Sequence, residues 1–390
     1  MADEPPTEID EPVASITPEE LRQHIDSGGD VFILDVRSKR DFEAWHIDGA
    51  NVEIVNHPYF QLLDGVPEDL HAKLPDDQKI TVLCAKGDSS EMVAEQLSED
   101  GYDVDHFARG MKGWARIYEY QELDVNVDAT IAQYQRPSSG CLAYLIVSAG
   151  AAAVIDPLHA FTEEYRRDVR ALGVELEYAL DTHIHADHIS GVRALAAQTD
   201  ATVVLPEAAA NRGVEYDHDY ETVADGDTIP VGDVDIEVLS TPGHTTGMTS
   251  YKVENVLFTG DGLFIESVAR PDLEDQKAAR NAAQTLYDTL KERVLNLPAD
   301  TTVAPAHFSN AATPDTDGTY TAELGQLKAS IDVLSMNTDE FVEFTVSNVP
   351  PRPANHADII ATNLGQQSLD ETTFELELGP NNCAAETLTN

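Results

Sequence analysis

The chain has 390 residues, more than one hydrophobic core usually supports, so we expect two domains or two domains with an extension. It carries 71 Asp and Glu against 24 Lys and Arg, and the resulting formal charge of −47 opposes binding to nucleic acid or to an anionic membrane. Three well-separated cysteines, no leader peptide and no run of 18 apolar residues predict a protein of the reducing cytoplasm, without a disulfide framework.

The first part of the chain is predicted to form a short tail and a small α/β domain. Residues 1–12 are acidic and contain prolines, which predicts a disordered tail. From residue 13 to 122, apolar runs such as "VFILDV" and "ITVLCA" alternate with helical patterns such as "TPEELRQHI" and "SSEMVAEQL". This alternation predicts a parallel sheet covered by helices.

The second part is richer in strands. Residues 128–312 contain the runs "CLAYLIVSAG", "AAAVIDP", "ATVVLP", "VDIEVLS" and "NVLFTGD", with helical patterns such as "EEYRRDVRALG" between some of them. Residues 313–390 hold two amphipathic helical stretches and a proline-rich segment. We expect a second α/β domain over 128–312, followed by a C-terminal helical extension.

Four strand-like runs are each followed by metal-binding residue types, in "EYALDTHIHADH", "DIEVLSTPGH", "NVLFTGD" and "TTVAPAH". In layered α/β folds, loops at strand ends converge on one crevice. The expected ligands of a metal site there are His183, His185, Asp187, His188, His244, Asp261 and His307. Asp187 and His188 are expected to begin the helix "HISGVRALAAQ", so that one cluster serves two adjacent metal positions.

The segment 128–312 resembles the metallo-β-lactamase superfamily, an αββα sandwich with its metal site at one edge of two packed sheets. The segments "THIHADHISG", "TPGHTTG", "FTGD" and "PAH" are similar to those of family hydrolases such as glyoxalase II. That resemblance implies two zinc ions, the first held by His183, His185 and His244, the second by Asp187, His188 and His307, with Asp261 bridging. A dinuclear zinc thioester hydrolase is therefore one candidate function.

The runs "FTGDGLFIESVARPDLED" and "AQTLYDTLKERVLNLPADTTVAPAH" resemble the persulfide dioxygenase branch more closely. This implies one Fe(II) per chain on His183, His244 and Asp261, with a low-molecular-weight thiol persulfide and O2 as substrates and sulfite and thiol as products. Two imidazoles and a carboxylate are the ligand set of non-haem Fe(II) oxygenases. The remaining candidates, His185, Asp187, His188 and His307, would then orient the ligands.

Two further residues of this domain, Arg270 and Asp272 in "ARPDLE", are expected to be exposed in a loop. The resemblance places them near the substrate pocket, where Arg270 would bind a substrate carboxylate through its planar guanidinium. Asp187 and Arg270 are thus the candidate catalytic residues beside the metal.

Cys84 lies in "TVLCAKGDSSEMV", between a strand and a helix, where backbone N–H groups and the helix dipole stabilise a thiolate or persulfide. A buried structural cysteine is the alternative. The flanking "LDVRSKRDFEAWHIDGA" and "FARGMKGW" resemble rhodanese domains, which implies sulfurtransferase chemistry at Cys84. Rhodaneses that take thiosulfate commonly carry arginine where this chain has Ser89, with Asp88 beside it, so we expect Cys84 to take sulfur from persulfides and not efficiently from thiosulfate.

Structural roles are expected for Cys141 and Cys383. The extension resembles the tail of rhodanese-fused members of the branch, where it would shield the iron or form the contact of a homo-oligomer. A third function also stays open, a sulfur-carrier or persulfide-sensing protein whose metal is structural and which takes up no oxygen.

The acidic composition predicts adaptation to a salt-rich cytoplasm, and we expect the melting temperature to fall when salt is lowered. Repulsion among the net negative charges reaches further as the Debye length grows from about 3 Å at 1 M to about 10 Å at 0.1 M salt. Thermal melts across a salt series measure this. A midpoint that does not change with salt would leave solubility as the only use of the charge.

Overall fold

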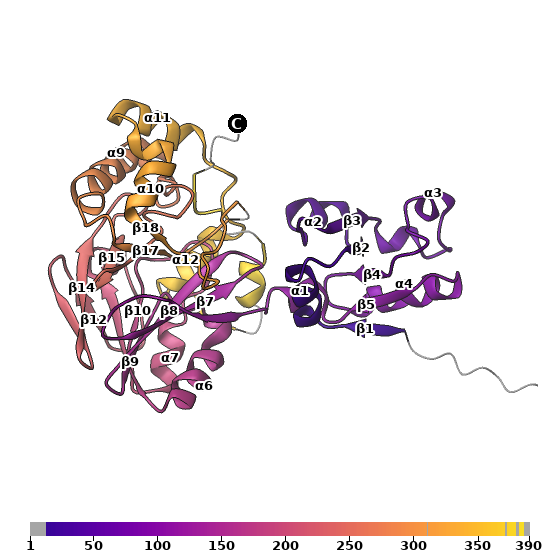
Figure 1. Ribbon diagram of the computed structural model, residues 1–390, viewed down its shortest axis with the longest axis horizontal. Helices are drawn as coiled ribbons and strands as arrows, with labels where there is room; N and C mark the ends of the chain where they lie inside the picture. The colour runs from indigo at the N-terminus through magenta and orange to yellow at the C-terminus, as the bar shows by residue number, and fades with distance from the viewer. Residues whose placement is uncertain (1–12, 310, 371–372, 380–381, 386–390) are drawn as a thin grey trace, which may run out of the picture. The chain divides into compact units, whose positions relative to one another are not determined.

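The computed structural model describes residues 13–309, 311–370, 373–379 and 382–385, so the tail expected over 1–12 lies outside the described residues (Figure 1). The chain forms two compact units and passes from one to the other between Ile117 and Tyr118. The first strand after this point, β6, pairs with β7 in the second unit.

The first unit is a five-stranded parallel sheet in the order β1-β5-β4-β2-β3. Its strands are β1 (Ala14–Ile16), β2 (Val31–Asp35), β3 (Val52–Asn56), β4 (Ile80–Leu83) and β5 (Val104–Phe107). Its helices are α1 (Pro18–Asp26), α2 (Lys39–Ala44), α3 (Glu68–His71), α4 (Asp88–Glu99) and α5 (Gly110–Trp114), with a 3-10 turn η1 (Tyr59–Gln61). The sheet has a separate apolar core on each face, one against α4 and one against α1 and α5. The α/β prediction is confirmed for this unit, which ends at Ile117, five residues before the bound expected at residue 122.

The second unit contains two sheets. The first has the order β12-β11-β10-β9-β8-β7-β6 and consists of β6 (Glu119–Glu122), β7 (Thr130–Arg136), β8 (Cys141–Ser148), β9 (Ala151–Ile155), β10 (Glu175–Leu180), β11 (Thr202–Pro206) and β12 (Tyr220–Val223). The other runs in sequence order and consists of β13 (Thr228–Val231), β14 (Val234–Ser240), β15 (Thr249–Val253), β16 (Val256–Gly260), β17 (Thr302–Pro305) and β18 (Ala322–Glu323).

Helices cover the outer face of each sheet (Figure 1). Those of the second unit are α6 (Thr162–Leu172), α7 (Val192–Gln198), α8 (Glu207–Ala210), α9 (Ala279–Thr289), α10 (Leu324–Ser330), α11 (Thr338–Ser347) and α12 (His356–Asn363). Short 3-10 turns occur at η2 (His159–Phe161), η3 (Gln276–Ala278), η5 (Asp332–Ser335) and η6 (Thr373–Glu377), and α9 continues into a π turn, η4 (Leu290–Val294).

Three apolar cores hold these layers together. The core between the sheets is built from inward-facing residues of both, among them Ile146, Ile236 and Phe258. A second core lies between the first sheet and α6 and α7, and a third between the second sheet and α9, α10 and α11. The layer order is therefore helix, sheet, sheet, helix, and the predicted αββα sandwich is confirmed.

Four strand ends bring the expected ligands to one edge of the sandwich. The ligand loops follow β10, β14, β16 and β17. Strands β16 and β17 are parallel neighbours with Gly260 opposite Pro305, so Asp261 and His307 emerge side by side.

The expectation that Asp187 and His188 begin a helix is wrong, because α7 begins only at Val192. Gly191 lies against the backbone of Pro157 and Leu158, and its N–H donates to the carbonyl of Pro157. These contacts keep residues 181–190 as an irregular loop.

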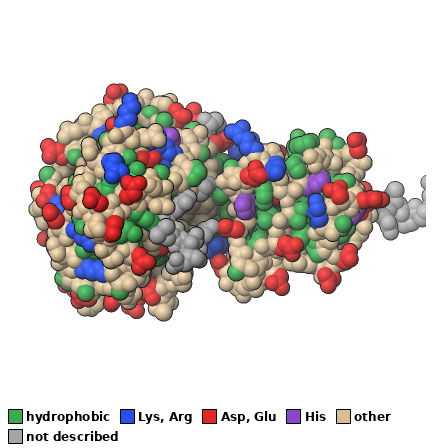
Figure 2. All heavy atoms as spheres, turned by 90° about the horizontal axis from the view of Figure 1, so that it is seen from above, with side chains coloured by type: hydrophobic (Ala, Val, Ile, Leu, Met, Phe, Trp, Pro, Cys, Tyr) green, Lys and Arg blue, Asp and Glu red, His purple; other side chains and the backbone are tan. Residues whose placement is uncertain are grey.

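No helix in the described ranges is long and apolar enough to cross a membrane. On the face shown in Figure 2, acidic side chains are spread over both units and do not gather in one patch.

Candidate metal centre

Three side chains leave bare donor atoms facing one another. Nε2 of His183 lies 3.7 Å from Oδ2 of Asp261, and Nε2 of His244 lies 3.6 Å from the same oxygen. All three residues are at most 1% exposed, and none of these three atoms has a hydrogen-bond partner. Unpaired buried polar atoms are costly unless something binds them. The two-nitrogen, one-oxygen set therefore fits a cation.

Hydrogen bonds fix the tautomers of both imidazoles. The hydroxyl of Thr182 donates its proton to Oδ2 of Asp156, at 2.9 Å, so it must accept from Nδ1 of His183, also at 2.9 Å. Nδ1 of His244 donates to the carbonyl of Arg270 at 2.9 Å. With the proton on Nδ1, each ring keeps a lone pair on Nε2, the form that binds a metal.

The protonation states of the three residues agree with this. Burial lowers the pKa of His244 and holds that of His183 well below its usual value, so both rings stay neutral. Burial acts to raise the pKa of Asp261, but the charge of His307 keeps it below its usual value, so the carboxylate is ionised. One anionic and two neutral donors are therefore available.

His307 lies between two carboxylates. Its Nδ1 is 2.5 Å from Oδ1 of Asp261, and its Nε2 is 2.7 Å from Oδ2 of Asp187. Burial acts to lower the pKa of His307, but the two carboxylates hold it well above its usual value, so both nitrogens carry protons. Nδ1 of His188 also contacts Asp187, at 3.1 Å, while Nε2 of His188 and Oδ1 of Asp187 have no partner.

His185 packs beside His183, with ring centroids 4.2 Å apart, and its Nδ1 has no hydrogen-bond partner. Its Nε2 lies 3.1 Å from Oδ1 of Asp156 and 3.8 Å from Asp181. Burial acts to lower the pKa of His185, but Asp156 raises it to about 9. Because Asp156 also binds Thr182, which accepts from His183, His185 supports the ligand His183 through this chain of contacts.

The expectation that Arg270 and Asp272 are exposed is wrong, since they are 1% and 6% exposed. The guanidinium donates to both oxygens of Asp272, at 2.7 and 3.1 Å, and to the carbonyls of Pro351 and Asn382, at 3.0 and 2.9 Å. These contacts occupy all three of its nitrogens. Arg270 thus ties the C-terminal extension to the domain, and its carbonyl, not its guanidinium, serves the metal site by holding His244. Binding of a substrate carboxylate by Arg270 stays a prediction that requires these bonds to break.

The structure adds residues of the extension that the sequence did not predict. Asn363 donates to the carbonyls of His185 and His188. Glu377 forms a buried ion pair with Arg136 at 3.1 Å. Cys383 lies in one cluster with Asp187, Asp261 and His307. None of these three follows a strand or belongs to a ligand spacing, so the sequence contains no local signal for them.

In the first unit, Cys84 follows β4 and precedes α4 and is 6% exposed. The N–H of Gly87 donates to its sulfur at 3.0 Å, and the hydroxyl of Ser90 lies 3.4 Å from it. Gly87 has φ of +115°, which favours glycine there and lets its N–H face the sulfur. The loop thus presents the backbone N–H of Gly87 to the thiol, with Lys86 and Asp88 exposed beside it.

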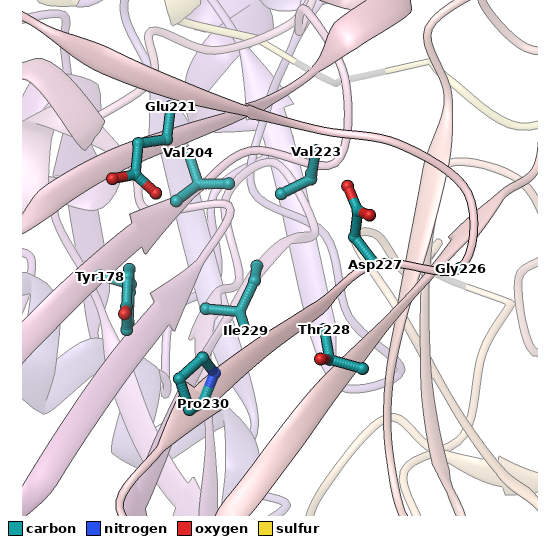
Figure 3. Close-up of a pocket in the computed structure, with 9 residues that line it drawn as sticks. All are labelled: Tyr178, Val204, Glu221, Val223, Gly226, Asp227, Thr228, Ile229 and Pro230. Carbon is teal, nitrogen blue, oxygen red and sulfur yellow. The ribbon is translucent and has the colours of Figure 1, made fainter.

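A pocket of about 400 Å³ opens elsewhere, between β12 and β13 (Figure 3). Its lining residues are Tyr178, Val204, Glu221, Val223, Gly226, Asp227, Thr228, Ile229 and Pro230. None of these residues belongs to the metal cluster.

Comparisons with known proteins agree with this geometry. Residues 137–307 match the metallo-beta-lactamase superfamily and residues 17–117 match the rhodanese-like domain. The mitochondrial persulfide dioxygenase ETHE1 of Bos taurus is 30% identical over 208 residues, which cover 52% of this chain and 74% of that protein. A hydroxyacylglutathione hydrolase of Rhodospirillum rubrum is 32% identical over 160 residues, 40% of this chain and 57% of that protein. The crystal structure of ETHE1 from Myxococcus xanthus has a TM-score of 0.53 at 28% identity and covers 61% of this chain and 99% of that chain.

Fold and ligand cluster together define a metal-binding αββα protein. The chain belongs to the persulfide dioxygenase (ETHE1-like) branch of the metallo-β-lactamase superfamily, with a rhodanese-like domain at its N-terminal side.

Replacing His244 by Ala should remove the bound metal, because one of the three converging donors is lost. Metal content per chain after gel filtration measures this. His218→Ala, at an exposed histidine of the same domain, is the matched control and should keep the metal. Equal metal content in both variants would show that His244 is not a ligand.

Proposed function

We propose that the chain is a persulfide dioxygenase that binds one Fe(II) through His183, His244 and Asp261. It would oxidise a low-molecular-weight thiol persulfide in the cytoplasm. In the balanced reaction, RSSH, O2 and H2O give RSH and sulfurous acid, which ionises to sulfite. The outer sulfur of the persulfide is oxidised, the S–S bond breaks, and the inner sulfur leaves as the thiol.

The observation that carries the proposal is the convergence of three bare donors, since the donor atoms of His183, His244 and Asp261 lie within 4.8 Å of one another. In contrast, both nitrogens of His307 and Nε2 of His185 are engaged by carboxylates. A second metal ion would have to displace Asp261 from His307. The arrangement therefore favours one metal with open coordination positions, as in non-haem iron oxygenases.

Iron bound at this point supplies the redox chemistry and the open positions for substrates. The chain's own residues hold and tune it. Thr182 and the carbonyl of Arg270 orient the two imidazoles, and protonated His307 holds Oδ1 of Asp261, leaving Oδ2 for the metal. All of these donors are buried.

One observation favours the alternative, a dinuclear zinc thioester hydrolase. Nε2 of His188 and Oδ1 of Asp187 are also without partners, next to the first cluster. The similarity to hydroxyacylglutathione hydrolases points the same way. In a hydrolase, two metals would activate a water molecule for attack on the thioester carbonyl.

Metal analysis of protein prepared without chelator separates the two functions. We expect about one iron per chain and oxygen uptake with a thiol persulfide. About two zinc ions per chain and thioester cleavage without oxygen uptake would support the hydrolase. Bound metal with neither activity would support the third candidate, a sulfur carrier with a structural metal.

His307→Ala tests the same choice at a single residue. In the mononuclear site it should keep the metal and lose about 10- to 100-fold in activity, the usual cost of removing a group that orients a ligand. In a dinuclear site it removes a ligand, and the metal content should fall from two to one. Metal content and oxygen uptake, measured on one preparation, distinguish these outcomes.

The rhodanese-like domain extends the proposal to sulfur transfer. Cys84 would accept the outer sulfur of a persulfide, so that RSSH and the Cys84 thiol give RSH and a Cys84 persulfide. Sulfite would then remove that sulfur as thiosulfate and restore the thiol. The support is the backbone donor from Gly87, which faces the sulfur at the N-terminal end of α4.

Replacing Cys84 by Ser should abolish the mass increase of one sulfur atom on the loop peptide after incubation with a thiol persulfide. Iron content and oxygen uptake should stay unchanged, because all iron ligands lie in the second unit. In the unsubstituted protein, loading from persulfide should be much faster than from thiosulfate. An equal load on the Cys84→Ser variant would refute the carrier role.

A further inference from the structure

The side chain of Asn363 contacts the metal-binding loop at three backbone groups. Its Nδ2 donates to the carbonyls of His185, at 3.0 Å, and His188, at 2.8 Å. Its Oδ1 accepts from the N–H of Ser190 at 2.9 Å. Asn363 is 1% exposed, so these bonds are shielded from water and use both amide protons and the carbonyl oxygen.

This loop needs such contacts because it has little secondary structure of its own. Residues 181–189 form neither helix nor strand, and Ser190 makes only an isolated bridge to Leu158. Buried backbone groups must still find partners. The amide of Asn363 supplies them at His185, two residues after the ligand His183, and at His188, one residue after Asp187.

Asn363 is itself held firmly. It ends α12, and the last carbonyls of that helix accept bonds from the body of the domain. Arg193 donates to the carbonyl of Thr362 at 2.6 Å, and Tyr216 donates to the carbonyl of Asn363 at 2.6 Å. The N–H of Glu215 donates to Leu364 at 2.7 Å. The end of α12 is therefore held in place, and from it the side chain of Asn363 contacts the loop of residues 181–190.

We propose that Asn363 is a positioning residue of the metal centre, which sets the path of the loop carrying His183, His185, Asp187 and His188. The C-terminal extension is then part of the metal site. Metal binding and the docking of α12 stabilise each other, because coupling between two binding events is reciprocal. The inference rests on the proposed metal at His183, His244 and Asp261, and not on the reaction carried out there.

Asn363→Asp tests the inference, since it keeps the shape and replaces two donated protons by an oxygen facing two carbonyls. We expect Co(II) affinity, measured by competition with a chelator, to fall about 10- to 100-fold. The visible spectrum of bound Co(II) should also change, because the imidazole of His183 is displaced. A residue with only a structural role would lower the melting temperature of metal-free protein and leave this spectrum unchanged.

Asn348→Asp is the matched control, the same substitution in the same extension, where the side-chain amide donates to the carbonyl of Phe344 in its own helix. It should leave affinity and spectrum unchanged. Equal Co(II) affinity and identical spectra for Asn363→Asp and the unsubstituted protein would overturn the proposal. Co(II) binding is measured without substrate, so this outcome is independent of whether the chain is an oxygenase.

A measurement on the unsubstituted protein covers the case in which Asn363→Asp does not fold. Hydrogen exchange of the amides of α12 should slow when Zn(II) or Co(II) is added, while exchange in α6, on the outer face of the first sheet, should not change. Exchange in α12 that is insensitive to the metal would overturn the coupling.

Discussion

The second unit depends on one constraint, a set of three buried acceptor atoms. These atoms face one another, and no proton lies between them. Nε2 of His183 and of His244 each present a lone pair, and Oδ2 of Asp261 presents negative charge. An unpaired buried polar group costs about 1–3 kcal/mol, and a charged one more. The fold holds these groups in place through contacts on their far sides, so a cation that binds them removes a cost already present in the metal-free protein.

Much of this arrangement was predictable from the sequence, because the ligands follow strands and strand ends meet at one edge. What the sequence did not predict depends on partners distant in the chain. Arg270 was expected to be exposed, but its guanidinium reaches carbonyls 81 and 112 positions away. The helix expected at Asp187 starts later, because Gly191 binds Pro157 and Asn363 binds Ser190, 173 positions further on. Hydrophobic periodicity reports the local preference for helix or strand, and the spacing of ligand-type residues reports ligand chemistry. Neither reports contacts between residues so far apart in the chain.

The C-terminal extension makes most of these long-range contacts. Its last described residues pair with the turn that follows Asp261, through a bridge between Ala269 and Ala384 and a bond from Arg270 N–H to the carbonyl of Cys383. The thiol of Cys383 lies in one cluster with Asp261, and burial and the nearby carboxylates hold its pKa well above the usual value. The extension thus places a neutral thiol beside the carboxylate ligand.

The acidic surface and the metal centre act on cations in different ways. A formal charge of −47 attracts divalent ions of every kind, but at physiological salt this attraction is screened within about 8 Å of each charge. The buried site selects by donor type, since imidazole nitrogen suits iron, zinc and cobalt, and carbonyl, carboxylate and water oxygen suit magnesium and calcium. Affinity alone would favour zinc over iron. His307 contacts Asp261 and Asp187 with its two nitrogens, so it would have to release one of them before it could bind a metal ion itself.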